Sequence, residues 1–350
     1  MSGIGSSSSR PVPSSTAAGA ISGLHVVDNT ILNASGQQVV LHGVNKSGTE
    51  YACIQGNGIF DPRGSDSVSA IKAMKAWTGV NAVRIPMNED CWLAINGAPA
   101  AYSGANYRNA IETLVDRLVQ LNLVPILDLH WTAPGTQQAT GQQPMPDEDH
   151  SVVFWKQVAT EFGNNSAVIF DVFNEPYPDN NTDTDEAWRC WKSGGTCTGI
   201  SFPVAGMQSL VTTIRATGAT NVLMLGGVEY SNALTQWTTH EPTDPLKNLA
   251  ASWHMYGGTT CSTETCWDEA PAQVATQVPL IAGEFGESYD GSDCTNSLVT
   301  TFTNWMDARK LSYLAWTWDS WGSCLSLVSN VWTGAPTSWG SFYKGHVAQF

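Results

Sequence analysis

The stretch VIFDVFNEPYPDNN, residues 168–181, changes character abruptly at its middle. Its beginning is an apolar run around one aspartate, which is typical of a strand covered on both faces in a parallel sheet. Pro176 cannot donate a ladder hydrogen bond, so the strand is expected to stop there. Asn174 and Glu175 are therefore predicted to lie at the C-terminal end of a buried strand, where enzymes with parallel sheets keep their reactive groups.

Further runs of this kind recur along the chain and alternate with helix-length segments. The other strand-like runs end near Asn45 or span residues 81–86, 123–131, 221–227, 249–256, 278–286 and 311–319. Amphipathic stretches predict helices at residues 69–79, 106–123, 150–163, 202–218 and 296–310. This alternation predicts an α/β fold: a single (β/α)₈ TIM barrel preceded by a small N-terminal β-hairpin within residues 24–45. A doubly wound sheet is the alternative, but the sequence lacks its Gly-rich phosphate loop.

Two domain segments follow from the composition along the chain. Residues 1–20 are rich in Ser, Pro, Ala and Gly, so we expect a flexible linker or an expression remnant, with a signal peptide removed upstream. Residues 21–350 are predicted to form the barrel domain. Its long loops at residues 91–104, 132–149 and 177–199 all follow strands, so on a barrel they would wall one cleft.

Composition restricts the class of ligand. The net charge of −15 argues against binding to nucleic acid or to anionic membranes, because both require surfaces rich in Lys and Arg. The chain has 15 tryptophans and 9 tyrosines beside only 16 Lys and Arg, which favours a neutral, polar ligand held on aromatic faces. The alternative is that many of these tryptophans simply fill the core.

The even number of eight cysteines fits an oxidised, extracellular protein. Proximity in sequence suggests the pairs Cys190/Cys197 and Cys261/Cys266 and, more loosely, Cys53/Cys91. Cys294 and Cys324 would then remain for each other, although the sequence alone leaves other pairings open. A zinc site is the rival interpretation, but the chain has no CxxC pair and no Cys/His cluster at finger spacing.

Polar residues at the strand ends should converge at one rim of the barrel. They are Arg84, His130, Asn174, Glu175, His254, Tyr256, Glu284 and Trp318. Two carboxylates facing each other suit glycoside hydrolysis, in which one group donates a proton and the other attacks the anomeric carbon. Arg84 and Tyr256 would stabilise a charged Glu284. We therefore assign Glu284 as the nucleophile and Glu175 as the acid/base.

The motifs RIP, LHW, FNEP, WHMY, GEFG and WTW follow in this order, and the chain from about residue 24 to 345 resembles glycoside hydrolase family 5, the cellulase/mannanase family. The resemblance implies a retaining enzyme with Glu175 as acid/base and Glu284 as nucleophile. It also implies that Asn174 binds the sugar 2-hydroxyl and that His130 and His254 hold hydroxyls and carboxylates. Arg84 and Tyr256 would surround the nucleophile, and both are assigned to substrate binding together with His130, Asn174, His254 and Trp318. A tryptophan platform would be Trp316 or Trp318; we favour Trp318, which lies nearer the rim.

Several residues receive milder interpretations. Asn88, Glu89 and Trp92 depart from the family pattern where distal sugar subsites would form, although a structural or solvated role for Glu89 is favoured. Asp128 and Asp171 are interpreted as buried structural supports. Glu241 is expected to be a loop carboxylate, Glu287 a rim contact or a residue without a role, and Glu229 and Tyr230 are as often cleft-lining as not. No metal or cofactor is expected, because no strong ligand spacing is present.

Taken with the resemblance, these residues predict a secreted, retaining β-glycoside hydrolase that cleaves plant or microbial polysaccharide. An endo-β-1,4-glucanase is favoured, because several tryptophans are expected to be exposed and to stack successive sugars; they are Trp92, Trp131, Trp188, Trp191, Trp267 and Trp321. Alternatives are a β-mannanase, another β-glucanase, an exo-acting β-glycosidase, or a carbohydrate-binding protein without activity. The expected partner is a polysaccharide or oligosaccharide substrate, and the expected state is a monomer.

Overall fold

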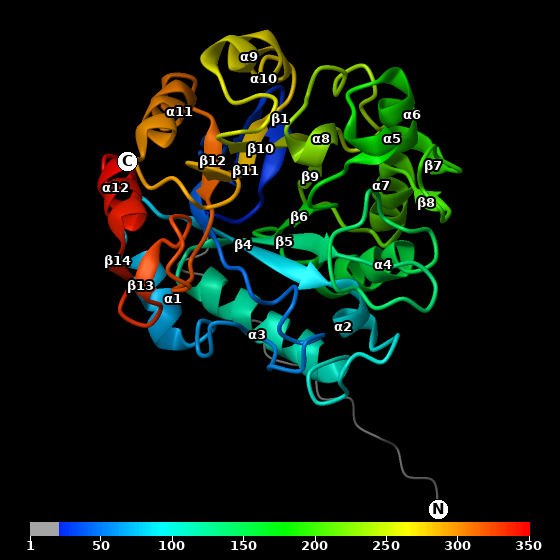
Figure 1. Cartoon of the computed structure of the whole chain (residues 1–350), viewed down its shortest axis with the longest axis horizontal. Coiled ribbons are helices and arrows are strands. Elements are labelled where there is room, and N and C mark those ends of the chain that lie inside the picture. The colour runs from blue at the N-terminus through cyan, green and yellow to red at the C-terminus, as the bar shows by residue number, and fades with distance from the viewer. Residues whose placement is uncertain (1–20) are drawn as a thin grey trace, which may run out of the picture.

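Eight parallel strands close into a barrel in the computed structural model, which describes residues 21–350 (Figure 1). In chain order they are β3 (His42–Asn45), β4 (Ala82–Asn88), β5 (Val124–Trp131), β6 (Ile169–Asp171), β9 (Leu223–Gly226), β10 (Leu249–Tyr256), β11 (Leu280–Gly286) and β12 (Ser312–Ala315). Each pairs with the next, and β12 pairs with β3, so the sheet has no open edge. The predicted (β/α)₈ barrel is confirmed and the doubly wound sheet is wrong. The linker predicted for residues 1–20 lies outside the described residues.

The inward faces of the strands change from apolar to polar along their length. Val124 and Ile126 of β5 lie in the core cluster at the N-terminal end of the barrel. Side chains two residues apart share a face of a strand, so Asp128 and His130 follow on the same inward side. The alternation therefore delivers polar groups to the C-terminal end only.

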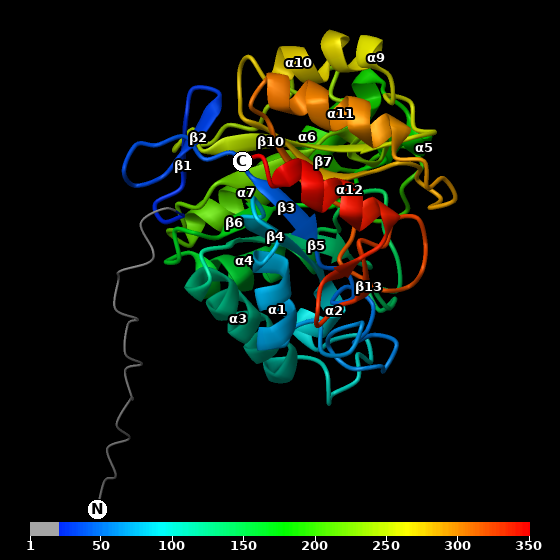
Figure 2. The ribbon, with the colours of Figure 1, turned by 90° about the vertical axis from the view of Figure 1, so that its left-hand side faces the viewer.

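A small hairpin closes the opposite end of the barrel. It consists of β1 (His25–Val27) and β2 (Thr30–Leu32), which Figure 2 shows at the end away from β13 (Val328–Asn330) and α5 (Pro178–Asn181). Leu24 and Ile31 are buried there together with Ala82 and Val124. The predicted N-terminal hairpin is confirmed, and it leaves only the C-terminal end of the barrel accessible.

Helices surround the barrel (Figure 1). All five predicted helices are present with somewhat different ends, as α1 (Val68–Lys75), α3 (Ala105–Gln120), α4 (Ser151–Phe162), α7 (Met207–Ala216) and α11 (Ser297–Ala308). The remaining ones are α2 (Glu89–Leu93), α5 (Pro178–Asn181), α6 (Asp185–Ser193), α8 (Val228–Ser231), α9 (Glu264–Glu269), α10 (Pro271–Val274) and α12 (Ser338–Val347). Two short ribbons complete the fold: β7 (Gly194–Gly195) with β8 (Val204–Ala205), and β13 (Val328–Asn330) with β14 (Ala335–Pro336). None of the described helices is long and apolar enough to cross a bilayer.

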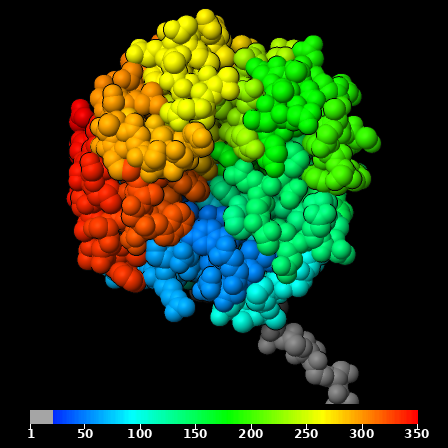
Figure 3. Space-filling view, viewed as in Figure 1, coloured from blue at the N-terminus to red at the C-terminus, as the bar shows by residue number. Residues whose placement is uncertain are grey.

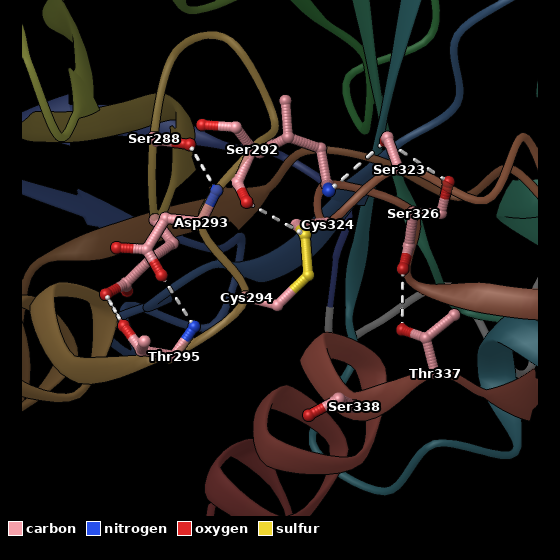
Figure 4. The surroundings of a disulfide bond; sticks show 12 residues. Ser288, Ser292, Asp293, Cys294, Thr295, Ser323, Cys324, Ser326, Thr337 and Ser338 are labelled. Atoms are coloured by element: carbon pink, nitrogen blue, oxygen red, sulfur yellow. Dashed lines mark hydrogen bonds between the residues drawn. A yellow bond between two sulfur atoms is a disulfide. The ribbon is translucent and has the colours of Figure 1, made fainter.

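Four disulfides fasten the loops, and all four predicted pairings are present. They are Cys53–Cys91, Cys190–Cys197, Cys261–Cys266 and Cys294–Cys324. Figure 4 shows the last of these, which joins the loop after β11 to the loop after β12. Beside it, the backbone N–H of Cys324 donates to the carbonyl of Gly291 at 3.2 Å. The two loops are therefore linked both covalently and by hydrogen bonding.

Candidate active site

Two carboxyl groups from distant parts of the chain meet at the C-terminal end of the barrel. Glu175 follows β6 and Glu284 lies in β11, and an oxygen of each lies within 4.8 Å of the other. Nδ1 of His254 lies between them, 2.8 Å from Oε1 of Glu175 and 3.7 Å from Oε2 of Glu284. The structure thus brings together the two glutamates that the sequence singles out.

Glu284 receives two hydrogen bonds that favour its charged form. Nη1 of Arg84 donates to Oε1 at 2.8 Å, and the hydroxyl of Tyr256 donates to Oε2 at 2.9 Å. Burial raises the pKa of Glu284, whereas His254 and Arg84 oppose that rise. The hydrogen bonds from Arg84 and Tyr256 stabilise a carboxylate, so Glu284 is the member of the pair better suited to remain ionised.

Arg84 is the centre of a buried polar network. Its Nε lies 2.8 Å from Oδ2 of Asp171 and its Nη2 3.1 Å from Oδ2 of Asp128. Its two Nη groups also donate to Asn174 at 2.8 Å and to Asn45 at 3.1 Å. Burial raises the pKa of both Asp128 and Asp171 to about 7. Both aspartates thus support the arginine, as the sequence analysis expected.

The complete burial of Arg84 corrects one part of the prediction. The sequence analysis placed it among the residues that bind substrate. The structure places it beneath the cavity, where every guanidinium nitrogen is used by a protein acceptor. Arg84 therefore acts on Glu284 and Asn174 rather than on a ligand.

Glu175 is held on both of its oxygens. Oε1 contacts Nδ1 of His254, and Oε2 accepts a hydrogen bond from Nε2 of Gln142 at 2.8 Å. Burial raises the pKa of Glu175, and the bond from Gln142 partly offsets that rise. Burial also lowers the pKa of His130 to about 4 and that of His254 to about 3, so both rings are neutral at physiological pH. The two rings can therefore hydrogen-bond in the site without adding charge.

A cavity of about 600 Å³ opens above the two carboxyls. Figure 3 shows this face, with the loops after β3 (blue), β5 (blue-green), β11 (orange) and β12 (red-orange) around its centre. Tyr289 and Leu325, on the two loops joined by Cys294–Cys324, both line the cavity. The predicted site residues that line it are His130, Glu175, His254, Tyr256 and Glu284.

The prediction that Trp318 forms the sugar platform is wrong. Trp316 lines the cavity and stacks on His130, with ring centroids 5.7 Å apart. Trp318 is fully buried, packs on Trp77 at 4.8 Å and donates its indole N–H to the carbonyl of Val331. The predicted strand ran to residue 319, but β12 ends at Ala315, so both tryptophans lie beyond the strand and nearness to its end does not decide which of them faces the cavity.

Most tryptophans expected to be exposed are in the core instead. Trp131 is half-buried and Trp321 is 49% exposed, but the other four are fully buried: Trp92, Trp188, Trp191 and Trp267. Trp188 and Trp191, for example, pack edge to face on each other with centroids 5.3 Å apart. An indole ring buries a large apolar area, so clusters of this kind stabilise the layer between helices and barrel.

Two short left-handed turns shape one wall of the cavity. Residues 179–181 in α5 (Pro178–Asn181) and residues 229–231 in α8 (Val228–Ser231) all have φ between 49° and 62°. Non-glycine residues adopt this conformation at a cost of about 1 kcal/mol or more each, so such runs are rare outside functional sites. The turns place Asn181, Glu229 and Tyr230 in the cavity lining, which decides the open question about Glu229 and Tyr230.

Residues 21–350 contain two groups of side chains whose spacing could suit a metal ion. One is Glu175, His254 and Glu284, already described; the other is Glu89, Asp147 and His150. In the second group the oxygens of Glu89 accept bonds from Ser151 and from the backbone of Ala133, and burial raises its pKa well above the usual range. A protonated carboxyl is a poor metal ligand, so this group is better explained as structural. Asn88, Glu89 and Trp92 are all fully buried, so they do not form distal subsites.

The sequence also matches a known protein family. The sequence profile described as "Cellulase (glycosyl hydrolase family 5)" matches residues 32–322, most of the chain. The chain belongs to glycosyl hydrolase family 5. It is therefore a glycoside hydrolase, and the resemblance noted in the sequence is confirmed.

Individual relatives of this family 5 hydrolase are distant and carry different names. It is 23% identical to a "Mannan endo-1,4-beta-mannosidase" of Salipaludibacillus agaradhaerens, over 91% of this chain and 90% of that protein. It is 24% identical to the "Beta-mannanase/endoglucanase A" of Caldicellulosiruptor saccharolyticus, over 79% of this chain but only 19% of the relative. A solved β-glucanase of Saccharophagus degradans in complex with cellotetraose superposes with a TM-score of 0.72 at 20% identity, covering 97% of this chain and 98% of that one. At 20% identity, this solved structure supports the fold of the chain and not its substrate.

Glu287 of the family 5 hydrolase has a structural function that the sequence analysis missed. Its carboxylate accepts hydrogen bonds from the backbone N–H groups of Ser297, Leu298 and Val299 at 2.8–3.0 Å, which lie in the first turn of α11. A carboxylate at a helix N-terminus satisfies otherwise unpaired donors and complements the helix dipole. The expectation of a rim contact or no role is therefore wrong.

Replacement of Glu287 is expected to weaken the fold. Glu287→Ala should lower the free energy of unfolding by about 1–2 kcal/mol, because three donors at the start of α11 lose their acceptor. Urea denaturation followed by tryptophan fluorescence measures this. Glu264→Ala, in the first turn of α9 where the cap is Thr263, is the matched control and should change the free energy by only a few tenths of a kcal/mol. Equal losses in the two variants would contradict the assignment.

Proposed function

We propose that this chain is a secreted, retaining endo-β-1,4-glucanase that acts by double displacement through a covalent glycosyl–enzyme intermediate. The observation that supports the mechanism is the short distance between the two carboxyls. One oxygen of Glu175 lies within 4.8 Å of one oxygen of Glu284. Retaining glycosidases separate the two groups by about 5–5.5 Å, whereas inverting enzymes need about 6.5–9.5 Å to admit a water between them.

The contacts of the two glutamates support distinct roles. Glu284, charged and held by Arg84 and Tyr256, attacks the anomeric carbon as the glycosidic C–O bond breaks. Glu175 gives its proton to the departing oxygen. In the second step Glu175 removes a proton from a water, which attacks the same carbon and releases the carboxylate of Glu284.

The sugar at the cleavage point would be held by the cavity-lining residues around this pair. Trp316 offers an aromatic face, and His130, His254 and Tyr256 offer polar groups. Oδ1 of Asn174 is occupied by Arg84, while its Nδ2 has no protein partner and is the donor we assign to the 2-hydroxyl. A buried donor without a partner is costly, so a substrate hydroxyl would relieve it.

Aromatic residues outside the cavity support action within a long chain. Tyr51 lies between Trp131 and Trp321, with ring centroids 6.0 Å and 5.9 Å from its own, and Trp321 is 49% exposed. Sugar rings stack on such faces, so this group would hold further units of a polysaccharide beyond the cleaved bond. β-Mannan is the second candidate, because a relative that matches 91% of the chain is named as a mannan endo-1,4-β-mannosidase. Secretion is proposed because the chain holds four disulfides, which persist in oxidising compartments.

A substrate panel with anomer analysis tests the proposal. Purified protein is incubated with carboxymethylcellulose, galactomannan, mixed-linkage glucan and aryl β-glycosides, and viscosity, reducing ends and the early product anomers by NMR are recorded. We expect a fast fall in the viscosity of the cellulose derivative and β-configured first products. Faster cleavage of galactomannan would select the mannanase instead. Release of single sugars without loss of viscosity would contradict endo action, and α-configured products would contradict the retaining mechanism.

A further inference from the structure

Gln142 stands out because it contacts Glu175 from a loop that belongs to neither of the two strands carrying the carboxyls. It lies in the long connection between β5 and α4, lines the cavity, and donates from Nε2 to Oε2 of Glu175 at 2.8 Å. We propose that Gln142 is a positioning residue of the acid/base, which fixes the orientation of the Glu175 carboxyl and favours its ionised form in the second step. The inference rests on the proposed retaining mechanism.

The backbone around Gln142 is fixed to the chain that follows Glu175. The hydroxyl of Tyr177 donates to the carbonyl of Gln142 at 3.2 Å, and the backbone N–H of Tyr177 donates to the carbonyl of Pro144 at 2.9 Å. Tyr177 is only two residues beyond Glu175. The loop that carries Gln142 is thus bonded to the same short segment, residues 175–177, that carries Glu175. These bonds limit the movement of the Gln142 amide relative to the Glu175 carboxyl.

The base of the same loop is held by residues 87–90, with the sequence MNED. This segment contains Asn88 and Glu89, which depart from the family pattern. Nδ2 of Asn88 donates to the carbonyl of Ala139 at 2.8 Å, and the N–H of Ala139 donates to Oδ2 of Asp90 at 2.8 Å. Oε1 of Glu89 accepts from the N–H of Ala133 at 3.3 Å. These three polar side chains are fully buried and are used to hold the loop. The segment therefore supports the placement of Gln142.

The chemistry of an amide suits this position. Its N–H donates to a carboxylate, and this bond stabilises the charged state of Glu175 that must receive a proton from water. Because the bond favours the carboxylate, its removal should raise the pKa of Glu175 above the value already raised by burial. The other titratable or charged groups around Glu175 stay unchanged in a Gln142 variant. Tyr177 lies on the same segment as Glu175, and the others come from β4, β5, β10, β11 and α8: Arg84, Asp128, His130, His254, Tyr256, Glu284 and Tyr230.

The test compares Gln142→Leu with the wild type and with Gln143→Leu, a leucine of the same size at the neighbouring position of the loop. For each protein, kcat/KM is measured against pH on the oligosaccharide that the wild type cleaves and on a 2,4-dinitrophenyl β-glycoside, whose leaving group needs no proton. In Gln142→Leu the basic limb of the oligosaccharide profile should move to higher pH by about one unit, because the acid form of Glu175 persists longer. The dinitrophenyl kcat/KM should stay within about threefold of wild type.

Two outcomes overturn the inference. One is a Gln142→Leu profile that overlies the wild-type profile or that of Gln143→Leu. The other is an equal loss on both substrates with no movement of the limb, which is the pattern of a merely distorted loop. The failure of the proposed function is recognised separately: the wild type would then cleave neither substrate, or would release products with the anomeric configuration inverted.

Discussion

Glu284→Gln is expected to lower kcat/KM on any cleaved β-glycan at least about 10⁴-fold, because an amide oxygen cannot form the glycosyl ester. The fold should survive, since the side chains have nearly equal volume and Arg84 keeps Asp128 and Asp171 as partners. Initial rates from reducing-end release, together with the thermal unfolding midpoint, measure both consequences. Residual activity above about 10% of wild type would remove Glu284 from the role of nucleophile.

Glu241→Gln is the matched control for this experiment. Glu241 also precedes a proline, as Glu175 does, and its THEP sequence imitates the acid/base motif. It lies in a different hollow beside Val26 and Asp28 of the N-terminal hairpin segment, away from the two carboxyls. Its replacement should leave kcat/KM within about twofold of wild type, which would show that loss of a glutamate as such does not inactivate the protein.

Arg84→Met should destabilise the protein more than any other substitution discussed above. It leaves Asp128, Asp171 and Glu284 buried without their shared cation, so the free energy of unfolding should fall by about 3–5 kcal/mol at neutral pH. The loss should be smaller at pH 5 than at pH 8. Asp128 and Asp171 have a pKa of about 7 even beside the arginine, and without it they would take up protons more readily. Denaturant titrations at both pH values measure this difference.

Arg215→Met supplies the comparison for Arg84. Arg215 makes a two-pronged contact with Asp244, with both N–O distances at 2.9 Å, and its side chain is also largely buried. It is paired with neither Glu175 nor Glu284. Its loss should reduce stability and leave kcat nearly unchanged below the unfolding transition, whereas Arg84→Met should lose activity even where it is folded. An Arg84→Met variant with wild-type stability and activity would contradict the network described here.

The local pattern of the sequence was sufficient for the barrel and for the two carboxyls that meet at its C-terminal end. Apolar runs such as residues 123–131 predict strands because burial on both faces demands continuous hydrophobicity. The stop at Pro176 predicted Glu175 near the end of its strand; β6 already ends at Asp171, and Glu175 follows it at the same rim, whereas Glu284 and His254 lie within the C-terminal parts of β11 and β10. Close spacing in the sequence suggested Cys190–Cys197 and Cys261–Cys266 and, more loosely, Cys53–Cys91, and Cys294–Cys324 was the pair that remained.

Tertiary structure alone decided which of the neighbouring side chains face the cavity. Trp316 lines the cavity and Trp318 is buried, although they are two residues apart. Both follow the end of β12 at Ala315, where the alternation of side chains along a strand no longer predicts which way they point. Gln142, Glu229 and Tyr230 come from loops and left-handed turns, whose course depends on contacts such as those between Ala139 and the buried Asn88 and Asp90. Periodic burial is a local property that residue order encodes directly, whereas the path of a loop is set by partners far away along the chain. The sequence therefore determined the scaffold and the two carboxylates, and the folded structure determined what surrounds them.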